Sequence, residues 1–265
     1  MLAPSAYKGT SGSISPLNGK IINSLVLRAS DGQELSLGHG FAQLKFDKKG
    51  GARMVGKLPD GTALSKSLVG IRDDLDGVVG IPIYHRSKGK VVSTLTGELV
   101  VQESAVESVP DLEGSVEWVR PEDASRKLLP QAFSCILTFT GYRWSAPNSI
   151  NILTGTVDSS EFTLVLDADS RVLDSPVSKS GIWPVSNKPT FSEPSADITF
   201  AVKPKTGVFS GKVILPALDG GKPKSAKYTG LLLSSPVEAL DTTLLHGAGF
   251  FLGPNAPAPV EIQSN

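Results

Sequence analysis

Residues 41–99 read FAQLKFDKKGGARMVGKLPDGTALSKSLVGIRDDLDGVVGIPIYHRSKGKVVSTLTGEL, and this stretch decides the fold. Its short segments of alternating apolar and polar residues are separated by Lys-Gly-Gly, Pro-Asp-Gly, Leu-Asp-Gly and Lys-Gly-Lys. Alternation with a period of two predicts half-buried strands, and Asp-Gly steps favour the tight turns of antiparallel neighbours. The stretch therefore predicts an antiparallel meander, with strands at residues 40–46, 53–58, 63–71, 78–85 and 91–101. Pro82 lacks a backbone donor, so we expect its strand to lie at a sheet edge or to carry a bulge.

The sequence on either side continues this pattern. Further strands are predicted at residues 24–29, 34–37, 114–119, 132–142, 151–166, 198–202, 207–215, 227–233, 249–252 and 259–263. Residues 121–129 predict one helical turn, because Pro121 and two acidic residues suit a helix N-terminus. Residues 167–196 contain four prolines and predict a long loop rather than regular strands.

Composition indicates a β-rich globular chain and argues against several partners. The 27 glycines and 19 prolines are spread along 265 residues, which suits many turns between short strands. Lys and Arg total 26, as do Asp and Glu, so no chain-wide attraction to nucleic acid is expected. No window approaches the roughly 18 consecutive apolar residues of a membrane helix, and residues 1–19 lack a signal-peptide pattern. We expect no nucleic-acid partner, no membrane insertion and no cofactor; the oligomeric state stays open.

A later stretch repeats the pattern of the first. Residues 41–58 can be laid on residues 198–213, because each contains a strand, a turn with Lys and Gly, and a second strand ending in Gly-Lys. A third strand follows each stretch, at residues 67–71 and 228–233. This correspondence predicts an internal duplication of a three-stranded meander.

The expected fold is all-β, with an antiparallel meander closed as a β-barrel and very little helix. A single meander cannot bury its apolar face, and open edges promote aggregation, so closure of the sheet is favoured. We expect residues 1–20 to form a lead-in segment and residues 21–265 a single β-barrel domain. Its halves, about 21–145 and 146–265, would be related by the repeat.

Three pieces of the chain combine glycine turns with core aromatic residues. They are residues 77–90, residues 112–121 and residues 205–253, the last with Gly-Ala-Gly-Phe-Phe-Leu-Gly near its end. Together they resemble an uncharacterised β-rich repeat domain from the C-terminal regions of large secreted or surface proteins of environmental bacteria. The resemblance covers about residues 38–253. It implies an extracellular or cell-surface location and an adhesive, binding or scaffold role, and it supplies no catalytic residue. His85 and residues 180–184 depart from it.

Metal-binding residue types are present without a metal-binding spacing. His39, His85 and His246 are the three histidines, and none lies in an HExxH or His-x-His arrangement. Asp73, Asp74 and Asp76, and the pair Asp167 and Asp169, are weak calcium candidates, because neither group has a downstream bidentate glutamate. We therefore expect no metal site. The single cysteine, Cys135, excludes an internal disulfide and is expected to be a buried structural thiol.

Catalytic candidates are limited to carboxylates and one histidine. Glycoside hydrolysis needs two carboxylates about 5–10 Å apart. Glu98, Glu103 and Glu117 could supply them from neighbouring strands, beside Trp118 and Trp144. His85 is a further candidate. The chain has no Gly-x-Ser-x-Gly elbow and no phosphate-binding loop, which argues against an α/β-hydrolase and nucleotide chemistry.

Aromatic side chains are the candidates for ligand binding, namely Tyr84, Trp118, Trp144 and Trp183. Three hypotheses stay open. The first is a non-catalytic module that binds a glycan or a surface protein. The second is a hydrolase that cleaves a glycosidic or ester bond with carboxylates or His85 at the barrel mouth. The third is a structural repeat of a surface scaffold.

Overall fold

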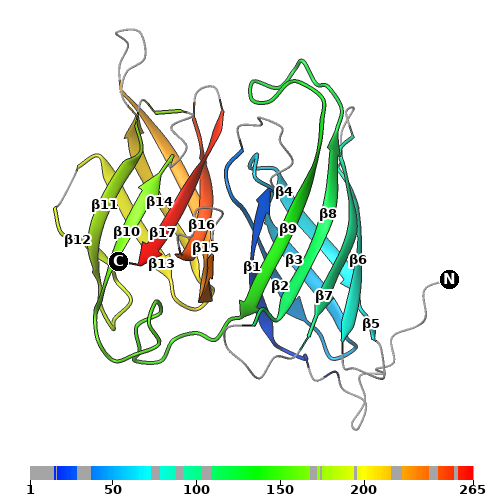
Figure 1. The fold of residues 1–265 in the computed structure, drawn as a ribbon, viewed down its shortest axis with the longest axis horizontal. Coiled ribbons are helices and arrows are strands. Elements are labelled where there is room, and N and C mark those ends of the chain that lie inside the picture. The colour runs from blue at the N-terminus through cyan, green and yellow to red at the C-terminus, as the bar shows by residue number, and fades with distance from the viewer. Residues whose placement is uncertain are drawn as a thin grey trace.

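The computed structural model describes residues 15, 17–28, 37–72, 78–87, 92–102, 109–167, 172–173, 175–193, 196–215, 223–238, 244–253 and 256–264. The regular elements in these ranges are all β-strands, arranged in two antiparallel sheets that lie side by side (Figure 1). No helix long and apolar enough to span a membrane is found in them. The predicted all-β, antiparallel fold is therefore confirmed.

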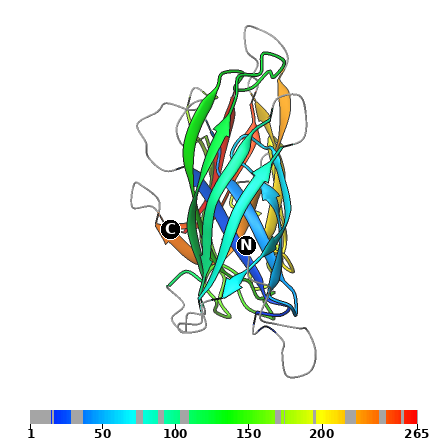
Figure 2. The same cartoon turned by 90° about the vertical axis from the view of Figure 1, so that its right-hand side faces the viewer.

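The first sheet contains nine strands in the order β4-β3-β2-β1-β9-β8-β7-β6-β5. Near its two ends, β4 contacts β6, so the sheet curls into a nearly closed barrel (Figure 2). The strands are β1 (Ile21–Arg28), β2 (Gly40–Phe46), β3 (Gly51–Lys57), β4 (Ala63–Val69), β5 (Ile71–Arg72), β6 (Val79–Arg86), β7 (Thr94–Val101), β8 (Leu112–Arg120) and β9 (Phe133–Arg143).

The second sheet contains eight strands in the order β12-β11-β10-β17-β16-β15-β14-β13. Its two end strands are brought together by Phe191 and Phe200, whose ring centroids are 6.2 Å apart. This sheet is therefore also nearly closed. The strands are β10 (Ser160–Leu166), β11 (Val177–Trp183), β12 (Thr190–Phe191), β13 (Ile198–Lys203), β14 (Val208–Leu215), β15 (Lys224–Glu238), β16 (Leu244–Leu252) and β17 (Pro257–Ser264).

The two sheets repeat one topology, which confirms an internal duplication. In each, the first strand pairs with both the second strand and the last: β1 with β2 and β9, and β10 with β11 and β17. Counting back from the last strands places β13–β15 opposite β5–β7. The alignment of residues 41–58 with residues 198–213 is therefore wrong in detail, because it joins β2 and β3 to β13 and β14, which occupy different places in the two sheets.

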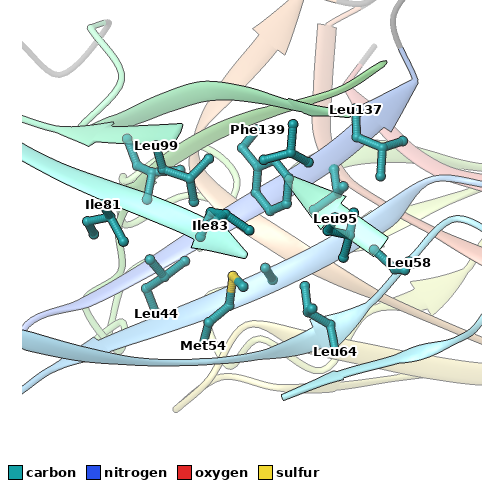
Figure 3. Packing of buried hydrophobic residues seen from close by; sticks show 14 of the residues in the cluster. Leu44, Met54, Leu58, Leu64, Ile81, Ile83, Leu95, Leu99, Leu137 and Phe139 are labelled. Carbon is teal, nitrogen blue, oxygen red and sulfur yellow. The ribbon is translucent and has the colours of Figure 1, made fainter. Parts of the chain in front are cut away.

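Each sheet encloses its own apolar core. In the first, side chains from β2, β3, β4, β6, β7 and β9 point toward one another, among them Leu44, Met54 and Leu99 (Figure 3). In the second, the core is built around Phe162, Trp183 and other aromatic rings. Alternation along each strand produces these cores, because successive side chains point to opposite faces.

Three predicted elements are corrected. The strand predicted at residues 151–166 begins only at Ser160, because residues 152–158 form turns and bends. Residues 121–129 form turns and no helix; Asp123 accepts hydrogen bonds from the backbone N–H and hydroxyl of Ser125 and so holds a turn. The predicted loop at residues 167–196 contains β11 and β12. The expectation for Pro82 is confirmed, because β5 pairs with β6 only at residues 79–80, and that side of Pro82 has no hydrogen-bonded partner strand among the described residues.

The two sheets meet through β1 and β2 on one side and β15 and β16 on the other. Phe41 stacks on Phe250, with 6.4 Å between ring centroids. The buried amide of Asn23 donates hydrogen bonds to the carbonyls of Thr206 (3.1 Å) and Leu232 (3.0 Å). Apolar packing and satisfied polar groups therefore join the sheets.

Candidate functional site

The register of β6, β7 and β8 brings three of the predicted residues to one face of the first sheet. Tyr84 lies opposite Thr96, which lies opposite Glu117, and in the next row Glu98 lies opposite Ser115. Their strands face the viewer in Figure 2. We call these outward-facing residues the Tyr84 face: Pro82, Tyr84, Thr96, Glu98, Ser115 and Glu117.

An exposed aromatic ring distinguishes this face. Tyr84 is 61% exposed and is the one aromatic residue among the large, exposed apolar side chains of the described residues. Thr96, Glu98 and Glu117 are exposed around it. Glu117 accepts a hydrogen bond from the Ser134 hydroxyl at 3.0 Å, which fixes one carboxylate oxygen. The face thus combines one flat ring with several hydrogen-bonding groups on a rigid sheet.

The two carboxylates of this face are diagonal neighbours. Because Glu98 faces Ser115 and Thr96 faces Glu117, the Cα atoms of Glu98 and Glu117 are roughly 7–8 Å apart by the geometry of antiparallel pairs. The catalytic acid of a glycosidase is typically a carboxyl group in apolar surroundings. Both glutamates here are exposed. The third predicted carboxylate, Glu103, lies outside the described residues.

His85 is separated from the two glutamates. It follows Tyr84 in β6 and shares the orientation of the buried Ile81 and Ile83, so it faces the interior of the first sheet. Its pKa is lowered by partial burial and, to a smaller extent, by the positive charge of Lys66. The structure therefore does not bring the three catalytic candidates together.

The three tryptophans are part of the packed interior. Trp118, Trp144 and Trp183 are 1%, 7% and 0% exposed, so none offers a ring to a ligand at the surface. Trp118 packs edge-on against Phe133, with 4.8 Å between centroids. The indole N–H of Trp183 donates to the Asn187 side chain at 2.9 Å. Their part in ligand binding stays a prediction, and their observed contacts are structural.

No group of three potential ligands for a metal ion occurs within the described residues. Asp73, Asp74, Asp76 and Asp169 lie outside them. The buried carboxylate of Asp167 accepts hydrogen bonds from the backbone N–H groups of Val172 (2.7 Å) and Leu173 (2.6 Å). It therefore holds the chain after β10.

The remaining two histidines and the cysteine lie apart from the Tyr84 face. His39 pairs with Glu261 across the junction of the two sheets, with 2.9 Å between Nε2 and Oε1. His246 is buried in β16, and desolvation lowers its pKa. Cys135 is buried in β9, which confirms the predicted burial of that thiol.

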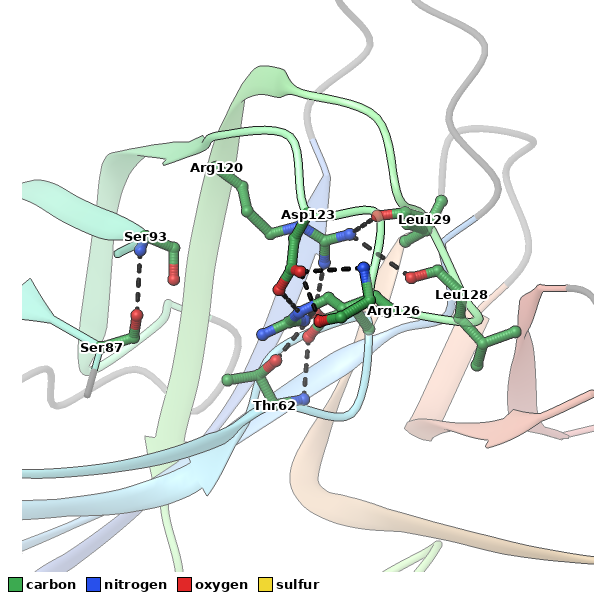
Figure 4. A network of polar contacts seen from close by, with 10 residues as sticks. Thr62, Ser87, Ser93, Arg120, Asp123, Arg126, Leu128 and Leu129 are labelled. Atoms are coloured by element: carbon green, nitrogen blue, oxygen red, sulfur yellow. Dashed lines mark hydrogen bonds and ion pairs between the residues drawn. The ribbon is translucent and has the colours of Figure 1, made fainter. Parts of the chain in front are cut away.

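A buried ion pair lies at one end of the first sheet, and no pattern in the sequence predicted it. Arg120 donates through Nη1 to Asp60 Oδ2 at 2.7 Å, and both side chains are 2% exposed. Arg126 Nη1 lies 3.3 Å from the same oxygen, and the Thr62 backbone N–H donates to the other oxygen (Figure 4). Arg120 also donates to the Leu129 carbonyl. The pair joins segments 60 residues apart, so only tertiary structure reveals it.

Comparisons with known proteins add little to this geometry. No protein-family model matches the chain, and no curated protein matches it. A crystal structure described as a "putative AttH" from Nitrosomonas europaea covers 99% of this chain and 99% of its own length, with 12% sequence identity and a TM-score of 0.22. Since that TM-score is too low to establish a shared fold, the likeness contributes nothing to the functional interpretation.

Proposed function

We propose that this protein is a non-catalytic binding module and that the Tyr84 face binds a glycan. The single observation that carries the proposal is the 61% exposure of Tyr84 on a regular strand. A flat ring exposed to water is a surface on which the apolar C–H face of a sugar can pack, and the phenol hydroxyl keeps its hydrogen-bonding ability.

The neighbours of Tyr84 support the same ligand class. Thr96 and Ser115 offer hydroxyl groups, and Glu98 and Glu117 offer carboxylate oxygens, all from adjacent strands. Sugar hydroxyls need such donors and acceptors around the ring contact. Strand pairing fixes the backbone positions of these groups, and the hydrogen bond from Ser134 restrains Glu117, which reduces the loss of freedom of that side chain on binding.

The proposed setting is the cell surface or the extracellular space. It rests on the resemblance of residues 38–253 to the repeat domain of secreted and surface proteins. There are two alternatives to glycan binding: a protein partner on the same face, or a scaffold role without any ligand. The experiment must distinguish them from glycan binding.

A hydrolase is the second candidate, and one observation favours it. Glu98 and Glu117 are diagonal neighbours on one face, with Cα atoms roughly 7–8 Å apart, so their side chains extend from adjacent strands toward the same side of the sheet, as a pair of catalytic carboxylates must. Their exposure is the argument against it. Turnover is therefore measured together with binding.

A glycan array tests the proposal directly. The wild-type protein is compared with Tyr84→Ala and with the matched control Ile182→Ala, which removes an exposed apolar side chain from the outer face of the second sheet. We expect wild type and Ile182→Ala to bind the same glycans and Tyr84→Ala to lose them. Equal binding by all three variants contradicts the proposed site, and no binding by wild type contradicts the proposed ligand class.

The catalytic alternative is tested with chromogenic glycosides and esters, using Glu98→Gln, Glu117→Gln and His85→Ala. We expect no turnover by the wild-type protein. Turnover that is lost in either glutamine variant would replace the binding proposal with a glycosidase on the same face. Turnover lost only in His85→Ala would place the chemistry inside the first sheet.

A further inference from the structure

Two buried hydrogen-bond donors lie at one end of the interior of the first sheet, on the side of β8 opposite to the Tyr84 face. Trp118 and Arg120 are two positions apart on the inward side of β8, and both are buried. The indole N–H of Trp118 and the Nε–H of Arg120 have no acceptor in the part of the chain that the structure describes. Buried donors are rarely left without an acceptor in native proteins, so each calls for a partner that carries an acceptor atom.

The two donors lie in one small region. The ring of Phe133, opposite Arg120 on β9, contacts both side chains: its centroid lies 4.8 Å from the Trp118 ring and 4.8 Å from the Arg120 guanidinium carbon. The two donors therefore flank one aromatic ring. The nearby loops of the polar network in Figure 4 cover this end of the sheet.

A row of inward-facing residues connects this region with the surface. His85 lies opposite Leu95, and Leu95 lies opposite Trp118. His85 is partly exposed and stands on β6, near β4 and its Lys66. The two strands are in contact but are not hydrogen-bonded neighbours in the sheet, so His85 lies at the seam that hydrogen bonds do not close.

The hydrogen-bonding groups of this region favour a ligand that accepts hydrogen bonds. The carboxylate of Asp60 already accepts from Arg120, Arg126 and Thr62. Asp123 accepts from Ser125 and pairs with Arg126. The free hydrogen-bonding capacity that remains is donor capacity, and Lys66 adds a positive charge at the seam.

We propose that this end of the first sheet binds a small carboxylate whose oxygens accept hydrogen bonds from Trp118 Nε1 and Arg120 Nε. The ligand enters along the seam between β4 and β6, past His85 and Lys66. Its non-polar part contacts Leu95 and Phe133, which are buried beside the donors. This site is independent of the Tyr84 face, because it lies on the opposite side of the same strands.

The test uses ¹H–¹⁵N spectra of the wild-type protein, in which the three indole N–H signals report on the three tryptophans. Butyrate is added up to about 50 mM, which covers weak, millimolar binding, and 1-butanol serves as the uncharged control. We expect the Trp118 signal to move saturably with butyrate and to stay in place with butanol. The Trp144 and Trp183 signals should not move, because their N–H groups already donate to Pro204 and Asn187.

The variant Trp118→Phe assigns the signal and measures the contribution of the donor. We expect butyrate to bind about tenfold more weakly to Trp118→Phe than to wild type, since a hydrogen bond to a charged acceptor is lost. If this variant does not fold, the Trp118 signal is assigned from its NOE contacts to the neighbouring backbone amides, and the wild-type titration still decides. Three results would overturn the proposal: butyrate leaves the Trp118 signal in place, 1-butanol moves it equally, or the Trp118 indole proton still exchanges with water at the highest butyrate concentration.

Discussion

Asp60→Asn should be among the most destabilising single substitutions in the first sheet. Asp60 is the buried counter-ion of Arg120, with 2.7 Å between Oδ2 and Nη1 and 2% exposure on both sides. Asparagine keeps the shape and one oxygen acceptor but removes the negative charge. The guanidinium of Arg120 then stays buried without a fully buried counter-ion, which typically costs about 3–5 kcal/mol.

We also expect substitution of the two partners to cost different amounts of stability. In Arg120→Met the carboxylate of Asp60 keeps Arg126, at 3.3 Å, and both donors of Thr62. Its desolvated charge is therefore still partly compensated, and we expect a loss of about 1–3 kcal/mol, typical of a broken buried hydrogen bond. Arg126→Gln is the control, and because Arg126 is 36% exposed its loss should stay below about 1 kcal/mol.

Urea denaturation at pH 7, followed by tryptophan fluorescence and circular dichroism, measures these differences. Coincident transitions by the two probes would justify a two-state treatment. A loss below about 1 kcal/mol for Asp60→Asn would refute the reasoning, since a buried, unpaired charge cannot be so inexpensive. A larger loss for Arg120→Met than for Asp60→Asn would refute the predicted asymmetry.

Three further predictions concern packing and pH. Burial lowers the pKa of His246, so this imidazole binds a proton more tightly in the unfolded chain than in the folded one. The free energy of unfolding should therefore be highest above about pH 6.5 and decrease below it. In urea melts from pH 7.5 to 5, His246→Gln should therefore lose less stability than wild type, and equal slopes would contradict this. A Cβ on Gly249 would lie 2.0 Å from the Thr229 carbonyl oxygen, so Gly249→Ala should lower the urea midpoint, and an unchanged midpoint would show that β15 and β16 are not so close. Leu99→Ala should cost about 2–5 kcal/mol and Val100→Ala less than about 0.5, because only Leu99 faces the core; similar losses would refute the alternation of β7.

Local patterns predicted most strands because the relevant forces act between neighbours in sequence. The hairpin of β2 and β3 is an example: a period of two and a Gly-containing turn are sufficient to specify it. The prolines between residues 167 and 196 led to a wrong prediction of a loop. Pro176 and Pro184 lie just before and just after β11, so they do not interrupt the strand. The turn at residues 121–129 is held by Asp123 and by the pairing of Arg126 with Asp60, contacts that no local pattern contains.

The candidate site could be predicted only in part. Tyr84 and His85 are consecutive, as are Glu117 and Trp118, so in a strand each pair must point to opposite faces. A site made from all four was therefore impossible, and this could have been recognised from the sequence. Which face is the interior depends on the curl of the sheet. The exposure of Tyr84 and the burial of the tryptophans required the structure.

The most direct test of the binding proposal is a ¹H–¹⁵N chemical-shift map, recorded with the strongest glycan from the array. We expect the largest shifts at the backbone amides of Tyr84, Thr96 and Glu117, with small changes in the second sheet and in the Trp118 indole. Shifts concentrated in the second sheet or inside the first would contradict it, and would move the binding site away from the Tyr84 face.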